Sequence, residues 1–226
     1  MYIKVILREK SMKKIRDLLP SYSVLPLFLM LLVNFFAYYV SKILISGREK
    51  YDFGIFIDDR IPLIAPFIVI YLLAYVQWVI GYIVVVRENE RTCSRAASAN
   101  IIAKTLCFLI FVIVPTEIER QAVSGTDIFS NLVKFIYFMD TPINLFPSIH
   151  CMESYAIIRF TLPLKTVGKT YKAVMCVFSV LVFLSVLFTR QHFIVDIPAG
   201  ILALEIGILI SRITKADTVF IKKQHK

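Results

Sequence analysis

Six apolar stretches, separated by segments rich in polar and charged residues, run along this chain. They lie near residues 22–45, 62–86, 99–115, 148–162, 171–189 and 193–212. An α-helix needs about 20 apolar residues to cross the hydrocarbon core of a bilayer, so the fourth stretch, with Arg159 near its end, is short. The pattern predicts an all-α, polytopic integral membrane protein with six transmembrane helices.

Two polar segments carry a weaker apolar pattern of their own. Residues 1–19 are basic and mildly amphipathic, which fits either a helix along the membrane surface or a solvated basic tail. The longest loop, 116–146, has apolar residues at helical spacing: Phe129, Leu132, Val133, Ile136 and Phe138. This loop predicts one interfacial helix that covers a site.

The length of 226 residues fits a single membrane domain, 1–226. We divide it into a basic interfacial segment (1–21), the first two spans with a cytoplasmic loop (22–98), a catalytic core of four spans (99–212) and a basic cytoplasmic tail (213–226). Cysteine usage adds little, because no C-x-x-C pair occurs. We therefore expect no metal site, no disulfide framework and no cofactor.

The formal net charge of +10 would suit a nucleic-acid partner, but the positions of the charges argue against one. Lysines and arginines gather at the ends of the apolar stretches, where they set the orientation of a membrane protein. Membrane lipids with anionic headgroups are the partners that this distribution favours, and no nucleic acid is expected.

The same charges predict which side each segment faces. Basic residues are frequent in the N-terminal segment, after the second span, between the fourth and fifth spans and in the C-terminal tail. The opposite segments have few, and the first of them contains Glu49, Asp52, Asp58 and Asp59. The positive-inside rule then places both termini in the cytoplasm, and residues 147–150 and 190–196 on the extracytoplasmic face, with a cell membrane as the expected location.

Those two outward-facing segments carry the candidate chemistry. His192 and Asp196 are four residues apart, so a helix would bring them within side-chain reach. A carboxylate beside an imidazole fixes the tautomer and stabilises the cation, as a nucleophilic histidine requires. Arg190 adds a guanidinium that can hold phosphate oxygens. The alternative is an interfacial histidine with a chance neighbour.

The other segment contains Ser148 and His150 at the start of the fourth span. Free N–H groups at a helix start bind phosphate, and the Ser148 hydroxyl can add a donor. His150 would lie just inside, where it can protonate a leaving oxygen. The alternative is a serine helix cap with an incidental histidine.

Arg120 falls on the same side and is a second candidate for holding phosphate, or else an arginine that reaches the membrane interface. Glu153 lies one turn below His150 inside the membrane, so we expect it to have a partner, either His150 or Arg159. Asp140 and Asn144 either shape the approach to the pocket or form turns.

Together these residues predict in-line phosphoryl transfer to a histidine. His192 attacks phosphorus, while Arg190, Arg120 and the Ser148 region stabilise the equatorial oxygens. His150 protonates the departing group, and water or another acceptor then attacks the phosphohistidine. No metal ion is required.

At these residues the chain resembles the type-2 phosphatidic acid phosphatase superfamily, the lipid phosphate phosphatases, over roughly residues 100–212. Pro147, Ser148 and His150 match the P-S-x-H of its second motif, and His192 and Asp196 match the H-x-x-x-D of its third. The resemblance implies His192 as nucleophile, Asp196 as its orienting group and His150 as general acid.

The chain departs from that pattern at the phosphate-binding positions. The first motif of the family has a Lys seven residues before an Arg-Pro pair; here Arg120 matches the Arg, but Ile113 and Gln121 replace the Lys and the Pro. Val186 stands where the third motif has its Arg. The compact third motif resembles the branch of inositol-phosphorylceramide and sphingomyelin synthases, which implies that a lipid can replace water as acceptor.

The leading hypothesis is a metal-independent phosphatase that acts on a lipid phosphate or pyrophosphate, with phosphatidate, phosphatidylglycerophosphate and polyprenyl pyrophosphate as candidate substrates. The main alternative is a lipid phosphotransferase with an alcohol or lipid acceptor. Two others are a transporter, for which Lys104, Glu153 and Arg159 would mark a polar path, and a non-catalytic relative that binds lipid.

Overall fold

A computed structural model describes residues 19–221, and their regular secondary structure is helical. The helices are α2 (Ser21–Leu44), η1 (Asp58–Arg60), α3 (Phe67–Glu88), α4 (Glu90–Ile113), α5 (Ile128–Met139), α6 (Ile149–Thr161), α7 (Lys169–Phe188), α8 (Asp196–Ile213) and η2 (Ala216–Thr218). The prediction of an all-α protein is confirmed for this range. Nearly all of the predicted interfacial segment 1–21, and residues 222–226 of the tail, lie outside the described residues.

Within residues 19–221, four helices are long and apolar enough to cross a membrane: α2, α3, α4 and α7. They indicate a membrane protein. α6 has only 13 residues, and the 18 residues of α8 include Asp196, Glu205 and Arg212. Six crossings and cytoplasmic termini therefore stay predictions.

The prediction of a loop between the second and third spans is wrong. α3 ends at Glu88 and α4 begins at Glu90, so the chain reverses at one residue, Asn89, whose side chain accepts a hydrogen bond from Thr92 N at 2.8 Å. The residues that follow are helical and mostly small, and Ala96 and Ala97 are buried. Small side chains let helices pack closely, which hydropathy alone does not reveal.

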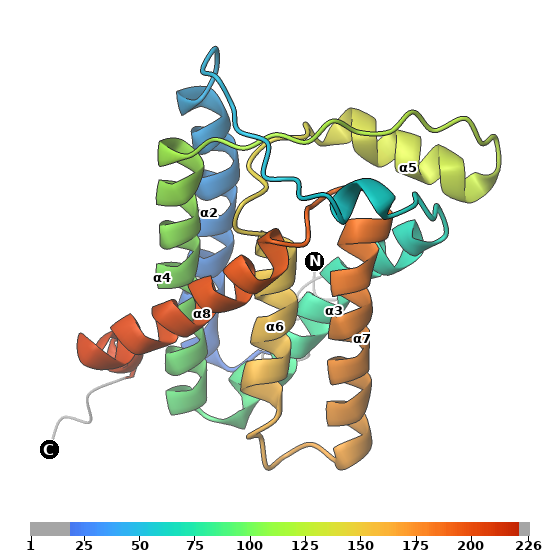
Figure 1. Cartoon of the computed structure of the whole chain (residues 1–226). Helices are drawn as coiled ribbons and strands as arrows, with labels where there is room; N and C mark the ends of the chain where they lie inside the picture. Colours follow the sequence, from blue (N-terminus) through green and yellow to red (C-terminus); the bar gives the residue numbers. More distant parts are fainter. Residues whose placement is uncertain (1–18, 222–226) are drawn as a thin grey trace, which may run out of the picture.

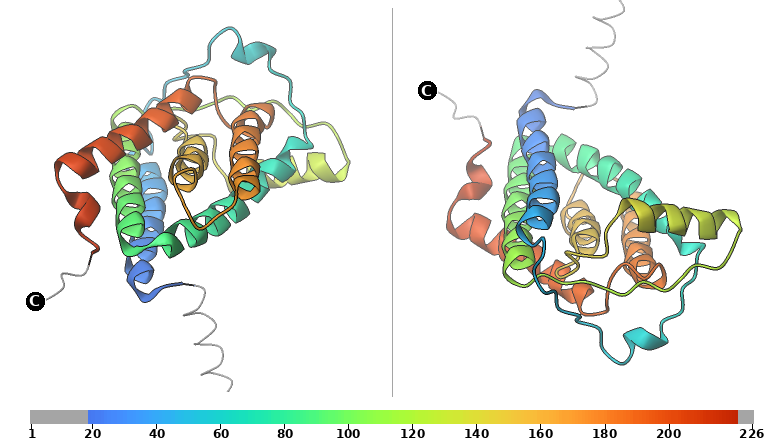
Figure 2. Two further views of the ribbon diagram at one scale, coloured as in Figure 1. Left: turned by 90° about the horizontal axis from the view of Figure 1, so that it is seen from below. Right: turned by 90° about the horizontal axis from the view of Figure 1, so that it is seen from above.

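α6 is the central helix. It packs against α3, α4, α7 and α8, while α2 and α8 both pack on α4 (Figure 1). α3 runs obliquely through the bundle, and α5 lies across the end at which α2 and α4 terminate (Figure 1; Figure 2). The loops 45–66, 114–127, 140–148 and 189–195 all gather at this end, which we call the loop end (Figure 1).

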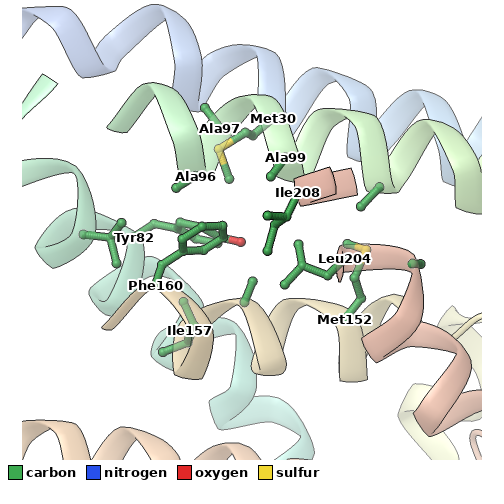
Figure 3. Packing of buried hydrophobic residues seen from close by; sticks show 14 of the residues in the cluster. Met30, Tyr82, Ala96, Ala97, Ala99, Met152, Ile157, Phe160, Leu204 and Ile208 are labelled. Carbon is green, nitrogen blue, oxygen red and sulfur yellow. The ribbon is translucent and has the colours of Figure 1, made fainter. Parts of the chain in front are cut away.

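The main hydrophobic core lies between these helices. Met30 of α2, Ala99 of α4, Met152 and Ile157 of α6 and Leu204 of α8 meet there (Figure 3). Small side chains on α4 face large ones on α6 and α8, so their surfaces fit together. Helices in a membrane associate largely through such packing, since lipid tails are as apolar as the side chains.

Two glycines let α8 approach its neighbours closely. A Cβ at Gly200 would lie 2.4 Å from the Ser148 carbonyl oxygen, and a Cβ at Gly207 would lie 2.5 Å from that of Ala99. α8 therefore packs backbone-to-backbone against the start of α6 and against α4.

A buried ion pair joins α4 to α6 below the loop end. Lys104 Nζ lies 2.6 Å from Glu153 Oε1, and the Glu153 carboxylate also accepts hydrogen bonds from Tyr82 and Asn100. The expected partners of Glu153 were wrong, because Lys104 reaches it from another helix. Arg159 pairs instead with Glu205 of α8, at 3.0 Å.

Candidate active site

The loop end brings the two sequence motifs together. α7 ends in a tight reversal in which Gln191 N and His192 N both donate to the Val186 carbonyl, at 2.9 and 3.2 Å. Such a reversal satisfies carbonyls left unpaired at a helix end and turns the chain back over the bundle. Ser148 N then donates to the Asp196 carbonyl at 3.2 Å, which joins the start of α6 to the start of α8.

His192 and Asp196 form the pair that their spacing predicts. His192 Nδ1 lies 3.0 Å from Asp196 Oδ2, and the same oxygen accepts a hydrogen bond from Phe193 N at 2.9 Å. Asp196 is fully buried. A buried carboxylate favours a proton on Nδ1 of the imidazole, so the lone pair is left on Nε2.

His150, in the first turn of α6, lies beside His192. The two ring centroids are 5.8 Å apart. Three aromatic residues of α3 surround the His150 ring: Tyr71 is stacked on it with centroids 4.7 Å apart, Trp78 lies 5.4 Å away, and Tyr75 Oη hydrogen-bonds its Nε2 at 3.1 Å. Because these residues follow at helical spacing, one face of α3 forms the wall behind the imidazole.

Both histidines line a cavity of about 320 Å³. Its lining combines aromatic and polar residues. The aromatic residues are Phe35, Tyr38 and Tyr39 of α2, Tyr71, Tyr75 and Trp78 of α3, and Phe111 of α4; the polar residues include Arg120, Asp140, Asn144 and Gln191. The cavity can therefore take a ligand with a polar end and an apolar end.

Arg120 lies in this cavity, as its predicted role requires. Its guanidinium donates to the Asp140 carbonyl at 2.5 Å, to the Tyr137 carbonyl at 3.2 Å and to Gln191 Oε1 at 2.5 Å. Burial lowers the pKa of Arg120, an effect that the Asp140 carboxylate opposes. The ordinary pKa of arginine is so high that the group keeps its charge.

Arg190 does not reach the cavity. Its backbone has φ of 53°, and its side chain points to the 58–61 turn, where Nη1 donates to the Asp58 carbonyl at 2.5 Å. Ser148 is also directed elsewhere, since its hydroxyl accepts from Cys151 N at 3.2 Å and caps α6. Of the three predicted phosphate-binding residues, only Arg120 lines the cavity. The alternative of a serine cap fits Ser148 better.

The interfacial helix expected in the loop 116–146 is α5, Ile128–Met139. Its Val133 is buried and its Ile136 lines the cavity, whereas Phe138 is 84% exposed. Asp140 and Asn144, which follow it, both line the cavity. Lys42 of α2, which the sequence did not mark, approaches this region by donating to Tyr38 Oη at 2.7 Å, and Tyr38 bonds Asp140.

Gln191 is one of the cavity residues that sequence reasoning missed. It is 3% exposed and lies between two residues that the sequence does single out. A buried, polar residue directly before a candidate nucleophile is the one signal that the sequence offers, and it is weak because glutamine side chains have many structural uses.

Among residues 19–221, no three His, Cys, Asp or Glu side chains come together in a group that could hold a metal ion. Comparison of the chain with known protein families, with curated proteins and with solved structures finds no match. A function must therefore be inferred from the residues and their geometry.

Proposed function

We propose that this protein is a membrane-embedded phosphatase that hydrolyses a lipid phosphate or pyrophosphate through a phosphohistidine, without a metal ion, on the extracytoplasmic side. The observation that carries the proposal is that His192, 3.0 Å from the buried Asp196, lines one cavity together with His150 and Arg120. The motif resemblance to the type-2 phosphatidic acid phosphatases supports the same chemistry.

The proposed reaction has two steps. Nε2 of His192 attacks phosphorus, and Asp196 stabilises the imidazolium that forms. Arg120 stabilises charge on the equatorial oxygens, and His150 gives a proton to the leaving oxygen as the P–O bond breaks. Water then attacks the phosphohistidine, gives its proton back to His150 and releases inorganic phosphate, so both histidines return to their first state.

The shape of the cavity supports a lipid as substrate. The C-terminal end of α3 contacts the N-terminal end of α2, where Tyr22 Oη of α2 donates to the Val86 carbonyl of α3 at 2.9 Å. From there α3 runs away from α2 toward the loop end (Figure 2). Most of the aromatic residues that line the cavity lie on these two diverging helices. An apolar chain held there would keep its phosphate at the histidines.

Phosphate release tests the proposal directly. Purified protein in detergent with EDTA is supplied with phosphatidate, phosphatidylglycerophosphate and polyprenyl pyrophosphate. We expect release from at least one substrate, its loss in His192→Ala and His150→Ala, and a loss of roughly 10⁴-fold in Asp196→Asn, as when the aspartate of a catalytic triad is changed. His225→Ala, which changes the third histidine, is the matched control.

Two further measurements define the outcome. A labelled phosphohistidine should accumulate in rapidly quenched wild type and be absent from His192→Ala. If the phosphoryl group is transferred to an added alcohol or lipid and no inorganic phosphate is released, the enzyme is a phosphotransferase instead. Full activity in His192→Ala would contradict the mechanism, and absence of both turnover and labelling would favour a non-catalytic lipid-binding or transport protein.

A further inference from the structure

We infer that the side-chain amide of Gln191 is a phosphate-binding donor in this cavity, taking the place that the sequence suggested for Arg190. The inference rests on the proposed function, since it names a residue that would hold the substrate of the same site. Gln191 lines the cavity with His150, His192 and Arg120, and its side chain is buried.

The chemistry of Arg120 fixes which end of the amide is available. Arg120 Nη2 lies 2.5 Å from Gln191 Oε1. A guanidinium has only donors, so it must face the oxygen of the amide and not the nitrogen. The amide orientation, which is otherwise ambiguous for glutamine, is therefore determined, and the NH₂ group is turned away from Arg120.

That NH₂ group has no acceptor among residues 19–221, although its nitrogen is buried. Arg120 Nε is also buried and without a partner in the same range. Buried donors are nearly always paired, because an unpaired one loses its bonds to water without compensation. Two such donors on adjacent, hydrogen-bonded side chains beside a candidate nucleophile match a ligand that offers several acceptor oxygens.

A phosphoryl group is such a ligand. One of its oxygens can accept from Gln191 Nε2 while another accepts from the Arg120 guanidinium, so a single cation and a neutral amide would share the equatorial oxygens. Arg190 cannot do so from its position, because its guanidinium bonds the backbone carbonyls of Asp58 and Ile61. The turn that directs Arg190 away from the cavity brings its neighbour Gln191 into it.

Two substitutions at Gln191 separate a phosphate-binding role from a structural one. If Gln191 only holds Arg120, then Gln191→Glu keeps an oxygen for Arg120 and should preserve activity better than Gln191→Met. If the amide binds phosphate, Gln191→Glu should be the more damaging change, because a carboxylate replaces the donor and repels the ligand.

We expect Gln191→Met to raise both KM and the inhibition constant for inorganic phosphate by about ten- to a hundredfold, the usual effect of losing a hydrogen bond to a charged group. Gln191→Glu should raise them further. Gln121→Glu, which adds the same charge on an exposed residue beside Arg120, is the matched control and should change both constants little.

A second readout does not depend on turnover. Inorganic phosphate, compared with chloride at equal ionic strength, should raise the unfolding temperature of wild type and of Gln121→Glu but not that of Gln191→Glu. Wild-type KM and phosphate inhibition in both Gln191 variants would overturn the role of Gln191 while leaving the phosphatase intact. If wild type shows no turnover and no stabilisation by phosphate, both proposals are overturned.

Discussion

At the residue scale, the structure assigns different partners to two histidines that look alike in the sequence. His192 bonds a buried carboxylate, whereas His150 is enclosed by aromatic rings and bonds a tyrosine hydroxyl. Each imidazole is therefore oriented by a different polar partner. Tyr75 is thus positioned to orient His150, and this leads to a prediction.

Replacing Tyr75 by Phe removes the hydroxyl 3.1 Å from His150 Nε2 and keeps the ring that packs beside it. We expect kcat to fall by about tenfold to a hundredfold with little change in KM. The general acid would lose its orientation, whereas the groups that bind the phosphate would remain in place. Steady-state kinetics on the preferred lipid phosphate measures both constants.

The control for this change is Tyr155→Phe. It removes another hydroxyl, which bonds Glu205 Oε1 at 2.8 Å and does not line the cavity. A uniform loss of activity in both variants would indicate lost stability, and an unchanged kcat in Tyr75→Phe would remove Tyr75 from the mechanism.

Sequence reasoning predicted the contact between His192 and Asp196 correctly, but not the geometry that makes it. Four-residue spacing on a helix was expected, whereas α8 begins at Asp196 and His192 lies in the turn before it. Sequence reasoning failed for Arg190, whose direction depends on a left-handed backbone conformation in the reversal after α7. It also missed Gln191, whose orientation is set by Arg120, 71 positions earlier in the chain.

At the element scale, α6 is held in position by charge as well as by packing. Its Glu153 lies one turn below His150 and bonds Lys104 and Asn100 of α4 and Tyr82 of α3. Lys104 also donates to the Met30 carbonyl of α2 at 3.2 Å. The helix that presents His150 is therefore connected to three others at one point inside the bundle.

Substitutions at the two members of such a buried pair should have non-additive effects on stability in a double-mutant cycle. Lys104→Met and Glu153→Gln should each lower the free energy of unfolding by about 3–5 kcal/mol, because each leaves the other group in the interior without its partner. The double variant should lose less than the sum of the two, which unfolding in detergent can measure.

The pair Lys50–Glu117, 3.9 Å apart at the loop end with a half-buried lysine and an exposed glutamate, gives the comparison. Lys50→Met should cost less than about 1 kcal/mol, since exposed ion pairs contribute little. Additive effects at Lys104 and Glu153 would show that the two charges do not depend on each other.

Helices themselves were easier to predict than the limits between them. Five of the six predicted apolar stretches overlap their helices with ends displaced by a few residues, and α5 appeared where the loop pattern placed it. The start of α4 was missed by nine residues, because its first turns are rich in Ser, Ala and Arg and pack through small side chains that hydropathy does not register.

At the scale of the whole molecule, the bundle has a loop end that contains the cavity and an opposite end where α3 meets α4 and α6 meets α7 (Figure 1). The basic residues Arg95, Arg159, Lys165 and Arg212 line a second hollow at that opposite end. Which end faces the cytoplasm stays a prediction from the charges along the sequence.

Sidedness can be measured by single cysteines in a cysteine-free background. Ser124→Cys is exposed in a loop at the loop end, and Thr166→Cys is exposed in the turn between α6 and α7. In intact cells, an impermeant thiol reagent should label position 124 and reach position 166 only after the membrane is opened. Labelling of both before opening, or the reverse order, would contradict the predicted orientation.

Gly200 indicates that the dimensions of the candidate active site are set outside it. The two segments that carry His150 and His192 are held together where α8 meets the Ser148 carbonyl, with no space for a side chain between the two backbones. One added methyl group would act as a wedge and move the two imidazoles apart, although every reacting group would still be present. The geometry of the candidate site therefore depends on a glycine that does not line the cavity.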